Sequence, residues 1–276
     1  MEDINIKKEF IHPFQHIDGV EDVQTYINLL DFEESEQSIK AYKKESYELL
    51  SLKPGDSVLE IGCGLGTDAR TLASQVGPTG RVIALDKSKR FLEVAAQRTD
   101  LPNVEFRHGD VNALDFEDNL FSACYSNRVF KYIENPLQAI SEMARVTKKG
   151  GKIFIAEVDT ESKMLIPHDE KIRSAIMSVT NRQFPQSRVA LNISSYYDQC
   201  GLKKINTLIR LLSFDGWNKN SGFISQDTIN LLNKAIKLGL ISQLERDHYI
   251  QACEEAEKKG IFKIYGLLFL IVGEKA

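Results

Sequence analysis

The stretch Val58-Leu59-Glu60-Ile61-Gly62-Cys63-Gly64-Leu65-Gly66-Thr67-Asp68 decides the fold. A short apolar run enters three closely spaced glycines, and a helical pattern follows them. Glycine permits a tight turn and lets the backbone approach a ligand closely. The N–H groups of such a loop, together with the N-terminus of the next helix, favour a carboxylate or a phosphate. The stretch therefore predicts a buried strand, a ligand-binding turn and a helix.

Short β-rich runs alternate with helical runs along the rest of the chain. This alternation is typical of a parallel sheet wrapped by helices. The expected strands cover residues 57–61, 81–86, 104–107, 121–126, 152–158, about 205–213, and 262–274. We therefore predict an α/β fold with a doubly wound, seven-stranded, mostly parallel sheet.

Three regions exceed this minimal alternation. They are residues 1–50, 160–202 and 215–260, and each contains helical patterns. The two later insertions leave the carboxyl ends of strands, which is the edge where open α/β sheets bind ligands. We therefore expect a single domain over residues 1–276. Its core is residues 51–159, its last strand is residues 262–274, residues 1–50 are an N-terminal helical cap, and the two insertions are helical caps.

Acidic residues follow the second and third strands. Asp86 ends the second strand, 24 positions after Gly62, where an acid can accept hydrogen bonds from both hydroxyls of a ribose. Asp110, in His108-Gly109-Asp110-Val111, reaches the same edge of the sheet and could accept from an adenine amino group. Each acid alone fits a helix cap or a turn equally well. The glycine loop and the two acids in this order favour a nucleoside cofactor.

With these motifs in place, the sequence resembles the class I S-adenosylmethionine-dependent methyltransferases from about residue 57 to residue 159. The matching segments are Glu60 to Gly66, Asp86, Gly109-Asp110-Val111, Ser126-Asn127-Arg128-Val129, Glu142, Arg145-Val146 and Gly150-Gly151. The variant is most similar to the small-molecule branch that includes the ubiquinone/menaquinone C-methyltransferases. Lys149, Ser122 and Tyr132 depart from the family pattern, and Tyr132 lies near the expected methyl acceptor, where a His is common.

The resemblance implies a Rossmann-like methyltransferase fold, S-adenosylmethionine as cofactor and S-adenosylhomocysteine as product. It implies methyl transfer to an oxygen, nitrogen or activated carbon of a small molecule by in-line displacement. The implied cofactor-binding residues are Glu60, Gly62, Cys63, Gly64, Gly66, Asp86, Lys87, Asp110, Val111, Asn127 and Arg128.

Some acceptors would also need a proton removed. The candidates are Glu157 and Asp159 at the end of strand five, Tyr132 after strand four, and His168 and His16 in the cap regions. Each has a structural alternative: Glu157 could pair with a cap arginine, Tyr132 could be core, and His168 could only precede a helix. No base is needed if the acceptor arrives deprotonated.

Two other functions fit part of the pattern. A nicotinamide dinucleotide site needs a glycine at position 67, where this chain has Thr67, and Gly66 comes one residue early. That function also leaves Asp110 and the segment from Glu142 to Gly151 unexplained. A non-catalytic module that binds S-adenosylmethionine and uses its cap for protein contacts would keep every motif.

The composition of the chain limits the kinds of partner that we expect. The chain has 35 Lys and Arg against 39 Asp and Glu, a net charge of −4 that suits a nucleic-acid backbone poorly. The four cysteines form no CxxC pair, so we expect no metal site and a reduced environment. The N-terminus has no apolar core, and the most apolar stretch, residues 265–272, is far shorter than the ~20 residues of a membrane helix. We expect a cytoplasmic protein that binds no nucleic acid and spans no membrane; a homodimer through an insertion is a possibility that no pattern supports.

Overall fold

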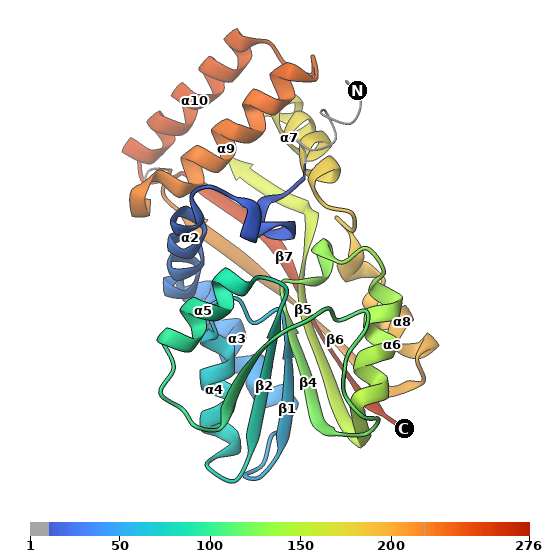
Figure 1. The fold of residues 1–276 in the computed structure, drawn as a ribbon. Helices are drawn as coiled ribbons and strands as arrows, with labels where there is room; N and C mark the ends of the chain where they lie inside the picture. Colours follow the sequence, from blue (N-terminus) through green and yellow to red (C-terminus); the bar gives the residue numbers. More distant parts are fainter. Residues whose placement is uncertain (1–10, 218) are drawn as a thin grey trace.

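The computed structural model describes residues 11–217 and 219–276, and for residues 219–223 it describes only the path of the backbone. In this part of the chain seven strands form one sheet, in the order β3-β2-β1-β4-β5-β7-β6 (Figure 1). The strands are β1 (Ser57–Ile61), β2 (Arg81–Asp86), β3 (Val104–His108), β4 (Phe121–Asn127), β5 (Thr147–Ile166), β6 (Leu202–Asp215) and β7 (Lys263–Lys275). The first five pair in parallel, and β7 runs antiparallel to both of its neighbours. The predicted doubly wound, mostly parallel sheet is confirmed.

Helices cover both faces of this sheet. The helices are α2 (Val23–Ser35), α3 (Gln37–Leu50), α4 (Thr67–Val76), α5 (Lys89–Gln97), α6 (Pro136–Val146), α7 (Glu170–Gln183), α8 (Ile193–Gln199), α9 (Lys219–Lys237) and α10 (Gln243–Lys258). Short 3-10 turns are η1 (Pro13–Gln15), η2 (Ile17–Gly19), η3 (Phe130–Tyr132) and η4 (Val189–Leu191). Side chains on a strand alternate between its faces, so Val58 packs with α3 and α4 whereas Leu59 packs with α6 and α8.

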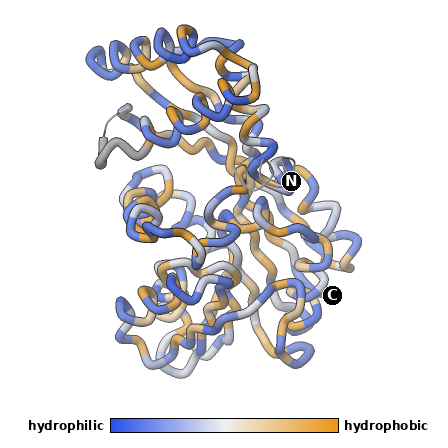
Figure 2. Tube along the Cα trace, turned by 45° about the horizontal axis from the view of Figure 1, so that its top comes forward, coloured by the Kyte–Doolittle hydropathy of each residue, from blue (hydrophilic) through white to orange (hydrophobic). Residues whose placement is uncertain are grey.

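Three helices lie beyond the carboxyl edge of the sheet. α7, α9 and α10 gather beyond the carboxyl ends of the parallel strands (Figure 1), and their apolar cluster, with Ile176 and Leu232, also includes Leu29 of α2 and Leu165 of β5. In Figure 2 these helices alternate polar and apolar residues around their turns, as amphipathic helices do. Among the described residues no helix is both long enough and apolar enough to cross a lipid bilayer.

The predicted cap boundaries need two corrections. β5 continues past residue 158 to Ile166, because Leu165 and its neighbours pair with β7 beyond an irregularity in register, so residues 160–166 are strand. The helices α3 and α8 lie on the sheet itself, since their apolar residues join the two sheet cores. Of the cap elements within residues 11–217 and 219–276, α2, α7, α9 and α10, with the turns η1 and η2, lie over the carboxyl edge.

Candidate active site

The glycine loop between β1 and α4 lies against the ends of neighbouring elements. The N–H of Gly62 donates to the carbonyl of Leu85 at 2.7 Å. A Cβ on Gly62, where φ is +70°, would lie 2.4 Å from a methyl of Val129. A Cβ on Gly66, where φ is +73°, would lie 2.8 Å from the ring of Phe106. Both glycines are therefore required by backbone conformation and by close approach.

A cavity of about 570 Å³ opens above this loop, at the carboxyl ends of β1, β2 and β4. Its volume falls within the range of about 300–1,000 Å³ typical of small-molecule and cofactor sites. The predicted cofactor-binding residues on its wall are Gly62, Gly64, Asp86, Lys87, Asp110, Val111, Asn127 and Arg128. We call it the first cavity.

Asp86 holds the loop and faces the first cavity. One carboxylate oxygen accepts from the N–H of Gly64 at 2.8 Å, and the other accepts from the N–H of Ser88 at 2.8 Å. Burial raises the pKa of Asp86, and these two backbone hydrogen bonds oppose that rise. Each oxygen retains a further lone pair, so the carboxylate can still accept hydrogen bonds from two adjacent hydroxyls.

Asp110 and Lys87 form an ion pair of 2.8 Å on the wall of the same cavity. The other oxygen of Asp110 accepts from the N–H of Asn112 at 2.9 Å. Although burial tends to raise it, the pKa of Asp110 is lowered by the hydrogen bonds from Lys87 and Asn112. Asp110 is thus an oriented, ionised acceptor beside the cavity. Its contact with an adenine amino group stays a prediction.

Three predicted cofactor-binding residues do not line the cavity. Glu60 is 2% exposed and lies on the opposite side of β1 from Ile61, which does line it. Cys63 is buried in the apolar core against α3 and α4, and burial raises the pKa of its thiol well above the usual value. Gly66 serves the close contact with Phe106. The structure therefore gives these residues supporting positions behind the loop.

Glu60 is a buried acid whose environment favours the protonated form. Burial, and then the charge of Asp68, raises the pKa of Glu60 well above its usual value. Its Oε2 is buried without a hydrogen-bond partner among the described residues. Where the unfolded chain has already released this proton, the folded chain keeps it.

We expect Glu60→Gln to change how stability depends on pH. Because the folded pKa is raised, the contribution of Glu60 to stability is present below pH ~4.3 and is lost as pH rises toward the folded pKa. The unfolding free energy of the variant minus that of the wild type should therefore be larger at pH 8 than at pH 4. Urea unfolding at both pH values measures this, and the exposed Glu48→Gln is the control. Parallel pH profiles for Glu60→Gln and the wild type would contradict it.

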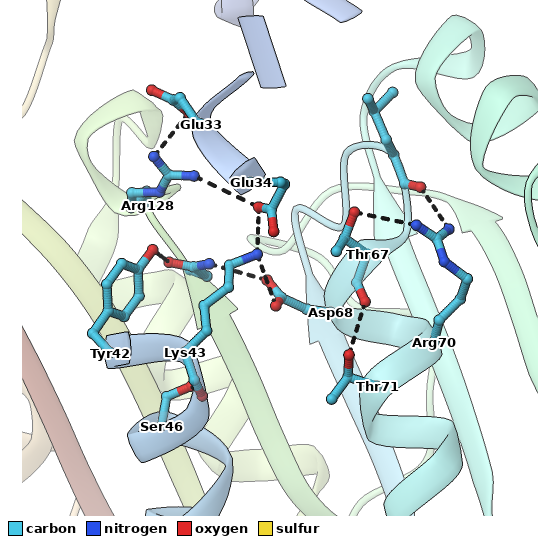
Figure 3. Close-up of polar contacts among 12 residues, drawn as sticks. Glu33, Glu34, Tyr42, Lys43, Ser46, Thr67, Asp68, Arg70, Thr71 and Arg128 are labelled. Carbon is cyan, nitrogen blue, oxygen red and sulfur yellow. Dashed lines mark hydrogen bonds and ion pairs between the residues drawn. The ribbon is translucent and has the colours of Figure 1, made fainter. Parts of the chain in front are cut away.

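Asp68, in the first turn of α4, is the centre of a buried polar network (Figure 3). It accepts hydrogen bonds from Tyr47 and from Asn127, and it pairs with Lys43 at 2.9 Å. Lys43 also pairs with Glu34 of α2. Despite burial, the pKa of Asp68 is lowered by Lys43 and by the hydrogen bonds. The network joins α2 and α3 to the helix that follows the glycine loop.

The same network orients the end of β4. The amide of Asn127 accepts from the hydroxyl of Tyr42 at 2.9 Å and donates to Asp68 at 3.0 Å. Arg128 adopts a left-handed backbone with φ +59°, which is uncommon for a residue other than glycine. Its guanidinium pairs with Glu33 of α2 at 2.8 Å (Figure 3). Both side chains are therefore held at the cavity wall by residues of the N-terminal helices.

The N-terminal segment also lies over the first cavity. Residues 14–18, in η1 and η2, contribute to its lining. Asp18 accepts from the backbone N–H groups of Lys89 and Arg90, so it caps α5 from outside that helix. Gln15 donates to the carbonyl of Gln183 at the end of α7 at 2.8 Å. The sequence predicts an N-terminal cap over residues 1–50 that includes His16, but no motif marks residues 14–18 as part of the cavity wall.

A second cavity of about 230 Å³ lies between α2, α7, α9 and the extended strands β5 and β7. Its wall is largely apolar and includes Leu29, Phe32, Phe184, Leu212, Phe214, Ile224, Leu231 and Ile264. It shares Glu33, Arg128 and Lys131 with the first cavity, so the two adjoin at these residues. Sequence reasoning missed this cavity, because it is formed by segments far apart in the chain.

The comparisons with known proteins agree with this geometry. A family profile described as a methyltransferase domain matches residues 52–227, which is more than half of the chain. The chain belongs to the class I S-adenosylmethionine-dependent methyltransferases. This assignment supports S-adenosylmethionine as cofactor, and the glycine cradle and the free lone pairs of Asp86 fit that molecule.

Individual relatives match part of the chain. An uncharacterised 37.1 kDa protein of a Streptomyces fradiae transposon is 36% identical over 56% of this chain and 46% of its own length. A demethylmenaquinone methyltransferase of Bacillus cereus is 33% identical over 55% of this chain and 63% of its own length. The matches thus span about half to two thirds of these relatives. The structure of Haemonchus contortus phosphoethanolamine N-methyltransferase 2 with S-adenosylmethionine is 20% identical, covers 85% of this chain and 52% of that one, and superposes with a TM-score of 0.55, which shows the shared fold.

Part of the family signature in this methyltransferase supports the fold and lies away from both cavities. Glu142 of α6 accepts from the N–H of Leu114 at 2.9 Å and from Arg145 at 2.8 Å. Arg145 in turn donates to the carbonyls of Leu114 and Phe116. These two side chains fix the loop between β3 and β4 and do not line the cavities.

The main candidates for a base lie in three different environments. Tyr132 lines the first cavity, and burial raises its pKa well above the usual value, so its phenol stays protonated. Glu157 is fully buried, lines neither cavity and accepts from the N–H groups of Lys131 and Val158. His168 is exposed in the turn before α7, 3.6 Å from Glu170, and lines neither cavity. Glu157 and His168 thus line neither cavity, and their roles as bases stay predictions.

The other two candidates differ as well. Asp159 lies 3.6 Å from Arg188, so the carboxylate that faces a cap arginine is this one and not Glu157. His16 lines the first cavity from the N-terminal cover. Lys131, one of the three residues that line both cavities, was not singled out by sequence reasoning.

Proposed function

We propose that this methyltransferase moves the methyl group of S-adenosylmethionine to an oxygen, nitrogen or activated carbon of a small molecule. The observation that carries this proposal is the pair of adjoining cavities. The first has the family's cofactor motifs on its wall, and the second is smaller and mostly apolar. Their shared boundary at Glu33, Arg128 and Lys131 is where a bound cofactor and an acceptor would meet.

The residues of the first cavity have distinct roles in this proposal. Asp86 accepts from the ribose hydroxyls, and Asp110 accepts from the adenine amino group. Val111 contributes an apolar wall for the adenine ring, and Asn127 and Arg128 flank the methionine part of the cofactor. When bound, the cofactor supplies a methyl group on a positively charged sulfur, and that carbon–sulfur bond breaks as the acceptor atom bonds to the methyl carbon.

The contribution of the chain is positioning and exclusion of water. The residue 14–18 segment covers the first cavity, and α7 and α9 cover the second. Well-oriented reactants can gain up to about 7–11 kcal/mol from positioning alone. Charge is lost along the reaction, so a covered and partly apolar site favours it. A relative that is 33% identical over 55% of this chain is a demethylmenaquinone methyltransferase, and this supports a small-molecule acceptor.

Thermal unfolding with ligands tests the proposal. S-adenosylmethionine and S-adenosylhomocysteine should each raise the midpoint by several degrees at one hundred times the dissociation constant, because binding then adds about 2.7 kcal/mol. NAD should not raise it. A shift with NAD alone would overturn the proposed cofactor.

Turnover is tested next. Small phenols, carboxylic acids, amines and thiols are incubated with the protein and S-adenosylmethionine, and release of S-adenosylhomocysteine is measured. Acceptor-dependent release is the expected result. Cofactor binding with no release across such a panel would instead favour a non-catalytic binding module.

A further inference from the structure

Lys131 lies where the two cavities meet. It belongs to η3, directly after β4, and contributes to the lining of both cavities. Its backbone N–H donates to the buried carboxylate of Glu157 at 3.1 Å, which fixes the base of the side chain. Its Nζ lies 5.2 Å from the ring centroid of Tyr132 and 5.5 Å from that of Phe184. The ammonium is therefore held among aromatic rings, at the boundary where an acceptor would meet a cofactor.

In the described part of the chain this ammonium has no hydrogen-bonded or ion-paired carboxylate. Glu33 pairs with Arg128 at 2.8 Å, and Asp227 lies 3.9 Å from Lys163. Glu157 accepts from two backbone N–H groups and raises the pKa of Lys131 through its charge, but it forms no ion pair with the ammonium. A largely buried cation without an anion is costly, so such groups are usually paired. The geometry leaves a place for one more negative charge.

The other charged groups of the second cavity do not supply that charge. Three cations, Arg128, Lys131 and Lys163, face two carboxylates, Glu33 and Asp227. His12 adjoins the same rings, and burial and then Lys131 lower its pKa to about 3, so it is neutral at pH 7. Burial lowers the pKa of Lys131, Arg128 and Lys163 lower it further, and Glu157 and Glu33 oppose them.

We infer that Lys131 binds an anionic oxygen group of the methyl acceptor. The acceptor is then an amphipathic anion: its carboxylate, phosphate or ionised hydroxyl lies against Lys131, and its compact apolar body fills the second cavity. An amine acceptor would instead add a cation beside Arg128 and Lys131. This inference rests on the proposed function, because it places the acceptor in the second cavity.

Binding of three matched probes tests the inference. 2-Naphthoate, 2-naphthalenemethanol and 2-naphthylmethylamine share one apolar body and differ in charge. S-adenosylhomocysteine is first titrated alone by calorimetry, and its failure to bind would overturn the proposed function itself. Each probe is then titrated into the protein saturated with S-adenosylhomocysteine. The naphthoate should bind at least tenfold more tightly than the alcohol or the amine.

Variants assign the preference to one side chain. Lys131→Met should weaken naphthoate binding at least tenfold and leave the alcohol within about twofold. Lys131→Arg should keep the preference for the anion. Lys163→Met is the matched control in the second cavity, and because its cation already faces Asp227, it should weaken naphthoate less than threefold. An anion preference unchanged in Lys131→Met, a preference for the amine, or no binding by any probe while S-adenosylhomocysteine binds would each overturn the inference.

Stability without ligand gives an independent readout. If the ammonium has no anionic partner until the acceptor binds, the thermal unfolding midpoint of Lys131→Met should equal or exceed that of the wild type. A midpoint several degrees lower would show that Lys131 supports the fold, and the inference would fail.

A phosphate, a carboxylate and an ionised hydroxyl share this chemistry. 2-Naphthyl phosphate and 2-naphthol, titrated alongside the naphthoate, separate them. If the anionic group of the acceptor is an ionised hydroxyl, 2-naphthol should bind the wild type more tightly as pH rises toward the pKa of 2-naphthol. Lys131→Met should show no such increase.

Discussion

Lys43→Met should lower the free energy of unfolding by about 3–5 kcal/mol, the usual result when one partner of a buried ion pair is removed. Lys43 is 5% exposed and lies between the carboxylates of Glu34 and Asp68. Burial alone would lower its pKa, and these two carboxylates raise it well above the usual value. Methionine fills the space of the side chain but leaves the buried carboxylate of Asp68 without its cation, and among the described residues leaves Glu34 only the guanidinium of Arg128, at 4.0 Å.

Urea unfolding at pH 7 measures this effect. The control is Lys44→Met, the next residue of α3, which points to solvent and should change stability by less than about 0.5 kcal/mol. Adding Asp68→Asn to Lys43→Met should recover part of the loss, because the two residues are in contact. A loss below 1 kcal/mol for Lys43→Met, or strict additivity of the pair, would show that the network contributes little to stability.

Disrupting the network should also weaken ligand binding. Asn127 is held by Tyr42 and Asp68, and Asp68 is held by Lys43. A folded Lys43→Met protein is therefore expected to bind S-adenosylhomocysteine more weakly, through a disordered Asn127 amide.

Asp86→Ala should weaken S-adenosylhomocysteine binding about 100-fold or more. Each hydrogen bond lost to a charged group costs about 1.5–3 kcal/mol, the two proposed ribose hydroxyls make two such bonds, and tenfold in affinity corresponds to about 1.4 kcal/mol. The variant also removes the acceptor for the N–H groups of Gly64 and Ser88 at 2.8 Å each. The glycine loop and the start of α5 then lose their anchor, so the cavity itself is less ordered before binding.

Two further variants separate these causes in calorimetric titrations. Asp86→Asn keeps one acceptor oxygen and should lose less affinity than alanine does. Asp110→Ala removes a partly exposed acid paired with Lys87 and should weaken binding about tenfold or less. Wild-type affinity in a folded Asp86→Ala protein would remove Asp86 from the proposed cofactor site.

Local patterns in the sequence specify the sheet and much of the first cavity. Glycines at positive φ and acids at strand ends are local features, and the carboxyl ends of parallel strands meet at one edge. For this reason Gly62, Gly64, Asp86 and Asp110 could be predicted before any contact was known. The other strand ranges followed from the same alternation to within a few residues, whereas β5 begins earlier, at Thr147 beside β4, and continues further, to Ile166 beside β7.

Only the tertiary structure decided which side chains reach the cavities. Glu60 and Ile61 are adjacent, yet only Ile61 lines the first cavity, because neighbours on a strand face opposite sides. Lys131 became a candidate because α2, α7 and α9, far apart in sequence, enclose it while their carboxylates pair elsewhere. His168, in contrast to Lys131, is exposed and lines neither cavity, because no distant segment of the described chain packs over it. Local pattern specifies backbone turns and strand ends; partner and burial at a given side chain depend on long-range packing.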